Sequence, residues 1–112
     1  MDKIRVFTKG RTGYEAKGIF ENNILIVLKD SKLSNQIAKT LPVKVSQLRN
    51  NKDIVNENNI LLRDISFNSA STAAGFVTGN ISNGLRVWKL ETGEELGDVV
   101  PGKMTKKKKE KR

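Results

Sequence analysis

The segment 14–29 constrains the fold most, because it has the pattern of a β-hairpin. From Tyr14 to Phe20 every second residue can face a core, which is the spacing of a half-buried strand. Asn22 and Asn23 follow, and asparagine tolerates the positive φ that a tight hairpin turn requires. The apolar run 24–28 is then expected to return as the most buried strand. This segment predicts an antiparallel sheet.

Further short strands are expected on both sides of this hairpin. Apolar positions within 3–7 indicate one strand, and an Asn-rich turn at 56–59 between two apolar runs predicts a second hairpin. Asn83-Gly84 is a turn dipeptide, and the residues 85–90 after it have the pattern of a strand. A final short strand is expected near Leu96, whereas 30–40 has no clear period and is expected to be a loop.

The spacing changes to that of an α-helix over about 70–78. Ser69 can accept hydrogen bonds from the free N–H groups of the first turn, and Gly79 can take the left-handed conformation that ends a helix. Ala73, Phe76 and Val77 share one side at helical spacing, so they are expected to pack on the sheet.

A second short helix is predicted over about 43–51, because Pro42 can occupy a first helical turn. The expected fold is therefore a small single α+β domain over 1–98, with a mostly antiparallel sheet and one main short helix. A length of 112 residues fits one such domain. Residues 99–112 are expected to form a disordered basic tail.

The net charge of +9 is unevenly distributed. Residues 103–112 carry seven Lys and Arg side chains against Glu110, a net +6, whereas the first 102 residues carry 14 basic and 11 acidic side chains, a net +3. A block of like charges cannot bury enough apolar surface to offset its ordering entropy. Such tails attract polyanions and also occur as plain solubilising ends, and the sequence leaves both interpretations open.

The absence of His and Cys removes the commonest general base, the thiolate nucleophile and the usual zinc ligands at once. Clusters of acidic residues near 53–57 and 94–98 lack supporting ligands, so they are interpreted as solvated surface charges. We therefore expect no enzymatic activity, no metal and no cofactor. The longest apolar run is far shorter than the roughly 20 residues that span a bilayer, so a cytoplasmic monomer with no membrane contact is expected.

Several motifs between Tyr14 and Asp98 occur in a fixed order. They are Phe67-Asn68-Ser69-Ala70-Ser71-Thr72-Ala73-Ala74, then Gly79, Asn83-Gly84, Trp88-Lys89, Gly93 and Leu96, with Ala16-Lys17-Gly18 and Val27-Leu28-Lys29-Asp30-Ser31 upstream. Together they resemble the domain of unknown function 4357 family, although Asp30, Ala70 and Leu85 stand where that family usually has Gly, Pro and Trp.

That resemblance implies a role but no chemistry, because the family has no established activity. Its members often lie beside nuclease domains of the GIY-YIG type or in proteins of restriction and modification. An accessory role on nucleic acid is therefore implied, with a nuclease or methylase as a candidate protein partner. No GIY-YIG motif occurs in this sequence, so any cleavage would have to come from that partner.

The candidate DNA-binding residues are cations, hydroxyls, an amide and one indole. They are Lys29, Ser69, Ser71, Asn83, Arg86, Trp88 and Lys89 in the expected domain, and Lys106, Lys107, Lys108 and Lys109 in the tail. A strand carrying Arg86 and Trp88 on one face could stack a base beside a phosphate contact. The simpler interpretation places Trp88 in the core. Capping likewise explains Ser69 and Ser71 without a phosphate, and a turn explains Asn83.

Two functions follow from the sequence. The first is a non-catalytic DNA-binding accessory module that contacts duplex phosphates, with the tail supplying most of the affinity. The alternative is a protein-interaction or structural module whose basic tail is incidental. A net charge of +3 outside the tail does not distinguish between these two functions. The test is whether the 14 basic residues outside the tail share one surface.

Overall fold

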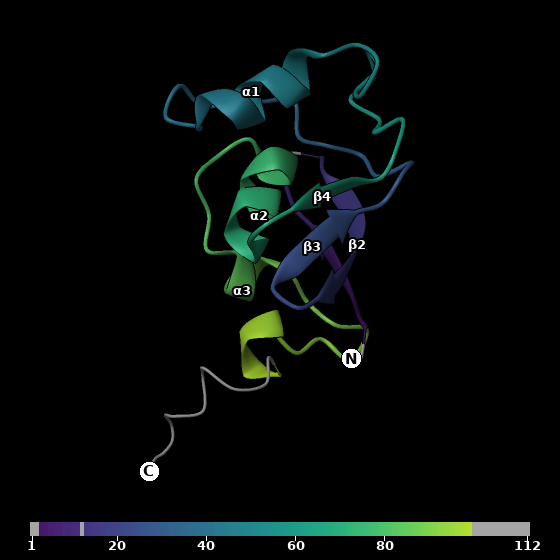
Figure 1. Ribbon diagram of the computed structural model, residues 1–112, viewed down its shortest axis with the longest axis vertical. Helices are drawn as coiled ribbons and strands as arrows, with labels where there is room; N and C mark the ends of the chain where they lie inside the picture. Colours follow the sequence, from purple (N-terminus) through teal and green to yellow (C-terminus); the bar gives the residue numbers. More distant parts are fainter. Residues whose placement is uncertain (1–2, 12, 100–112) are drawn as a thin grey trace.

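A computed structural model describes residues 3–11 and 13–99 of the chain. One antiparallel sheet contains β1 (Ile4–Lys9), β2 (Glu15–Glu21), β3 (Ile24–Val27) and β4 (Ile65–Phe67), in that order across the sheet. The helices are α1 (Val43–Asn50), α2 (Ala70–Thr78), α3 (Gly84–Val87) and the 3₁₀ helix η1 (Leu96–Asp98). In Figure 1, α1 lies at one end of the molecule beyond α2, and η1 lies near the other end. The predicted α+β class is confirmed.

The β2–β3 hairpin forms as predicted. Asn22 and Asn23 have φ values of 55° and 66°, the positive torsions that the tight turn requires. Strand β3, expected to be the most buried strand, has Leu25 and Val27 fully buried, while Ile24 is 42% exposed. The described residues cover one face of the sheet, so the strand alternates between core and surface.

Helix α2 confirms the pattern read from the sequence and covers the core face of the sheet. The Ser69 hydroxyl accepts a hydrogen bond from the Thr72 N–H at 3.0 Å, and Gly79 ends the helix with a φ of 80°. Phe76 is fully buried, and its ring centroid lies 5.1 Å from that of Phe67 on β4. Burial of this aromatic pair fixes α2 against the sheet.

Helix α1 forms as predicted, but its most consequential contact comes from a residue whose burial the sequence did not indicate. The Arg49 side chain is only 6% exposed and reaches from α1 to the last turn of α2. Its Nη1 donates to the carbonyl oxygen of Phe76 at 2.7 Å, and Nη2 donates to the carbonyl oxygen of Ser34. Burial lowers the pKa of the Arg49 guanidinium to about 10.

The predicted strand over 85–90 is wrong at 85–87, where the chain forms helix α3, whereas Lys89 does pair with β1 through an isolated bridge. The Asn83 side chain accepts a hydrogen bond from the Leu85 N–H at 3.1 Å and so caps the helix. Gly84 packs directly on the backbone of Ala70, where a Cβ would lie 2.1 Å from the carbonyl. This close approach, which a turn signal cannot reveal, sets the path of the chain.

Several shorter segments differ from expectation in detail. The second hairpin is reduced to an isolated bridge between Val55 and Leu61, and the expected strand near Leu96 is the helix η1. Strand β4 was not predicted, because three residues are too few to show a period. Residues 30–40 form a loop, as expected. Disorder was expected for the tail, residues 99–112. All of these residues except Val99 lie outside the described part of the chain.

Candidate nucleic-acid interface

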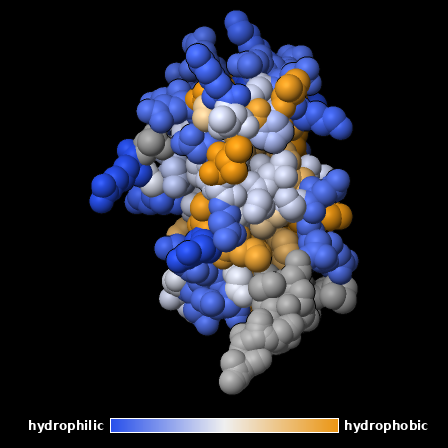
Figure 2. Space-filling model, turned by 90° about the vertical axis from the view of Figure 1, so that its left-hand side faces the viewer, coloured by the Kyte–Doolittle hydropathy of each residue, from blue (hydrophilic) through white to orange (hydrophobic). Residues whose placement is uncertain are grey.

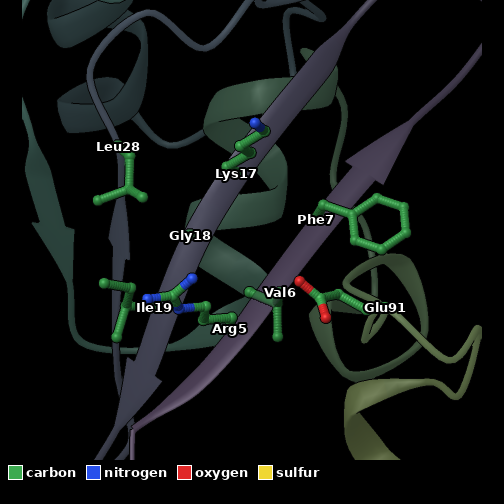
Figure 3. A pocket seen from close by; sticks show the side chains of 8 residues that line it. All are labelled: Arg5, Val6, Phe7, Lys17, Gly18, Ile19, Leu28 and Glu91. Atoms are coloured by element: carbon green, nitrogen blue, oxygen red, sulfur yellow. The ribbon is translucent and has the colours of Figure 1, made fainter.

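The sheet has a second face, opposite to the one that α2 covers. Figure 3 looks onto this face, with α2 behind the strands. A shallow hollow of about 520 Å³ lies there. Its lining residues are Arg5, Val6 and Phe7 of β1, Lys17, Gly18 and Ile19 of β2, and Leu28 and Glu91. We call the surface formed by Arg5, Phe7, Lys17, Ile19, Leu28 and Lys89 the open sheet face.

Phe7 lies at the centre of this face, between two lysines. It is directly opposite Lys17 of β2, and on its other side it pairs with Lys89. The Phe7 N–H donates to the Lys89 carbonyl at 2.8 Å, and the Lys89 N–H donates back at 2.9 Å. Residues paired in this way direct their side chains to the same face of a sheet. The Lys89–Phe7–Lys17 row therefore places an aromatic ring that is 37% exposed between two ammonium groups.

A third cation lies in the neighbouring row. Arg5 is opposite Ile19, which is opposite Ile26 of β3. In Figure 3 the Arg5 guanidinium extends across β2 toward Ile19. The Arg5–Ile19–Ile26 row therefore adds an apolar surface to this face, and the Arg5 guanidinium lies over it.

Carboxylates lie at the margin of the open sheet face, including Glu15 and Glu21, which alternate to the same face of β2 as Lys17 and Ile19. Glu91 lines the hollow, and Glu95 pairs with Lys89 on the side away from Phe7. Within residues 3–11 and 13–99, however, Arg5, Lys17 and Lys89 form no ion pair within 4.0 Å. These three cations are therefore free to meet an anionic ligand.

The described part of the chain contains no group of three or more Asp or Glu side chains that could hold a metal ion. What the open sheet face can do is bind an anion beside an aromatic surface. Among the described helices, none is long and apolar enough to cross a membrane.

Comparison with known families supports the resemblance noted from the motifs. Residues 6–100 match the family described as Domain of unknown function (DUF4357). The chain belongs to the DUF4357 family. The matched region begins before the motifs at 14–98 and includes Phe7 as well as Lys17 and Lys89. No curated protein and no solved structure matches the chain.

The structure places Trp88 in the core of this DUF4357 domain. The indole is 0% exposed, and its Nε1 donates to the carbonyl oxygen of Ala70 at 3.2 Å. The ring offers no face to a base, so the stacking platform considered for Trp88 is corrected and the core interpretation is confirmed. Arg86 lies on α3, not on a strand beside Trp88, and its Nε is 3.9 Å from Glu95 Oε1.

Lys89 alone among the candidates near Trp88 joins the Lys89–Phe7–Lys17 row. The polar candidates take part in local hydrogen bonds: the Ser71 hydroxyl accepts from the Gly84 N–H at 3.0 Å, as Ser69 and Asn83 do within their caps. Lys29 is exposed just beyond β3, where its N–H donates to Asp64 Oδ1 at 2.7 Å. Lys106, Lys107, Lys108 and Lys109 lie outside the described residues.

Arg5, Phe7 and Lys17 were not expected from the sequence to be site residues of the DUF4357 domain. A signal for them exists, because Arg5 and Phe7 alternate with the apolar Ile4 and Val6 and must point away from the core. The pairing of Phe7 with Lys89 carries no such signal, since it joins the two ends of the domain.

Proposed function

We propose that this protein is a non-catalytic nucleic-acid-binding module that contacts DNA through its open sheet face. The observation that carries the proposal is the convergence of Arg5, Lys17 and Lys89 around the exposed ring of Phe7. These three basic residues outside the tail share one surface. Lys and Arg bind nucleic acid chiefly by neutralising backbone phosphates and releasing counterions.

The tail adds to this affinity in the proposed function. Residues 103–112 hold a net +6 of the total charge of +9. A basic segment raises the local concentration of a polyanion and its rate of encounter. The tail is proposed to supply affinity without sequence preference, while the open sheet face orients the ligand.

We further propose that the module is cytoplasmic and accessory to a nuclease or methylase of a restriction-type system. The support is the resemblance of its motifs to a family whose members often accompany such enzymes. The sequence has no His or Cys, so the chemistry would come from the partner protein.

A salt series tests the proposal. The full-length protein and the variant Arg5→Gln/Lys17→Gln/Lys89→Gln are titrated with labelled DNA. Each phosphate contact contributes about 0.9 to the slope of log affinity against log salt on duplex DNA, so loss of three contacts should lower that slope by about 2 to 3. The matched control is Lys39→Gln/Lys44→Gln/Lys52→Gln, which removes the same charge from exposed positions elsewhere. Equal effects of the two triple variants would overturn the assignment of the interface.

A protein-interaction module is the alternative function, and one surface favours it. An apolar groove between α1 and the segment after α2 is lined by Leu41, Val45, Gly75 and Ile81, and Ile81 is 68% exposed. Figure 2 shows the side of the molecule on which α1 lies in Figure 1, and hydrophobic patches there reach the surface between hydrophilic residues. If the full-length protein binds no DNA at low salt, this groove becomes the better candidate interface.

A further inference from the structure

We infer that the open sheet face prefers single-stranded to duplex DNA, with an unpaired base stacked on Phe7 and the flanking phosphates on Lys17 and Lys89. This inference rests on the proposed function and specifies its substrate class. The observation that motivates it is the position of the only exposed aromatic ring of the described sheet within a row of cations.

The geometry of the Lys89–Phe7–Lys17 row suits a single strand. Neighbouring strands of a sheet lie about 4.8 Å apart, so the two lysines begin one strand spacing to either side of the ring. Long, flexible lysine side chains can then meet phosphates on both sides of one nucleotide. A base between these phosphates would lie over the ring of Phe7, an arrangement in which every base offers a π-face.

The apolar part of the face fits bases better than a duplex backbone. Ile19 on β2 and Leu28 just beyond β3 line the same hollow of about 520 Å³ as Phe7, a volume within the range of small-molecule sites. In a duplex the base faces are already stacked, and the grooves admit a helix or a two-stranded ribbon, not a broad sheet. A duplex would therefore set its phosphates against these apolar side chains, whereas a single strand can turn its bases toward them.

Glu91 bears on the orientation of the bound single strand. Its carboxylate is the acidic group that lines the hollow, and Figure 3 shows it beside β1 near Phe7 and Val6. A carboxylate repels phosphates, so it disfavours a backbone that runs through the hollow. The phosphates should follow the lysines, and the base side of the strand should face Ile19 and Leu28.

The test compares single-stranded and duplex DNA of equal length by fluorescence anisotropy, using the full-length protein at moderate salt. Phe7→Ala should lower the affinity for the single strand by about 5- to 150-fold, the cost of losing one base–aromatic stack. It should change duplex affinity by less than about 2-fold, since no base is stacked there. Phe7→Trp should retain the single-strand affinity, and its new indole fluorescence should be quenched by the single strand.

The control is Ile24→Ala, which truncates another exposed apolar residue of the same sheet, and it should leave both affinities unchanged. Equal losses on both ligands after Phe7→Ala, or no loss on either, would overturn the preference for single strands. In that case the triple charge variant still tests the proposed function. Absence of binding to both ligands by the unaltered protein would overturn the two proposals together. Far-ultraviolet circular dichroism of each variant verifies that the fold is retained.

Discussion

Trp88 donates its indole N–H to the carbonyl oxygen of Ala70, in the first turn of α2, across 3.2 Å. The residue that follows, Lys89, pairs with Phe7 of β1. The buried indole therefore anchors the segment that carries one of the three cations of the open sheet face. A core residue that was considered as a ligand contact thus acts on the interface through its neighbour.

Replacement of Trp88 by Phe should destabilise the domain even though an aromatic ring remains. The change deletes the N–H donor and leaves a small cavity, for a combined cost of about 2 to 4 kcal/mol in the free energy of unfolding. Urea unfolding followed by circular dichroism measures this cost. Retention of full stability would show that the hydrogen bond to Ala70 contributes nothing.

Two phenylalanines provide a matched comparison of stability. Phe76→Ala removes a fully buried ring from the contact with Phe67 and should cost about 3 to 5 kcal/mol. Phe7→Ala removes a ring on the open sheet face and should cost about 1 kcal/mol or less, because less apolar surface returns to water. Similar losses in the two melts would contradict the assignment of Phe7 to a functional surface.

Arg49 should not tolerate replacement by Lys. The guanidinium donates to the carbonyls of Phe76 and Ser34 at once, and a single ammonium cannot reproduce this fork. Loss of one partner for a buried carbonyl should lower the free energy of unfolding by about 1 to 3 kcal/mol. The matched control is Lys44→Arg on the exposed side of α1, which should change stability by less than about 0.5 kcal/mol.

The lowered pKa of Arg49 also predicts a pH dependence. Its folded pKa of about 10 lies below the ordinary value of arginine, so above that pH the unfolded chain holds more protons on this residue than the folded one. The free energy of unfolding then rises with pH through this group. The difference in stability between the unaltered protein and Arg49→Met should be constant from neutral pH to about 9 and should move in favour of the unaltered protein above about 10. If the difference in the free energy of unfolding instead shrinks above about pH 10, the burial of the Arg49 charge is contradicted.

Deletion of residues 103–112 should lower the affinity for DNA without removing the preference for single-stranded over duplex DNA. It removes a net +6, so the salt dependence of DNA binding should flatten, and the affinity for both single strands and duplexes should fall at low salt. The ratio of single-strand to duplex affinity should stay the same or increase, since the open sheet face is intact. If the deletion abolishes the preference for single strands over duplexes, the tail and not the open sheet face distinguishes the two ligands.

The sequence predicted those elements whose signals are local. Asn22 and Asn23 fix a turn by their own torsions, and Ser69 and Gly79 bound α2 by their own hydrogen bonds and backbone conformation. Asn83 also gives a local signal, but that signal is compatible with both a turn and a helix cap. The close contact of Gly84 with the backbone of Ala70 decides in favour of the cap.

The candidate site was less predictable because distant pairings create it. Lys89 was identified from sequence, yet its companions Phe7 and Lys17 became visible only through the register of β1. The burial of Arg49 has the same origin, since its hydrogen-bond partners lie in other segments of the chain. Periodicity indicates which face a residue occupies and not which residues share that face.

The pairing of Phe7 with Lys89 also has a consequence for biosynthesis. Strand β1 leaves the ribosome before the segment that pairs with its edge, because Lys89 lies near the end of the domain. Contacts of such sequence separation form late, because the loop between them must first be closed. A nascent or prematurely terminated chain that ends before Lys89 would display Phe7 without one of its two lysines. The complete Lys89–Phe7–Lys17 row is therefore present only in chains that extend beyond Lys89, so products truncated before it should bind the proposed ligand less well.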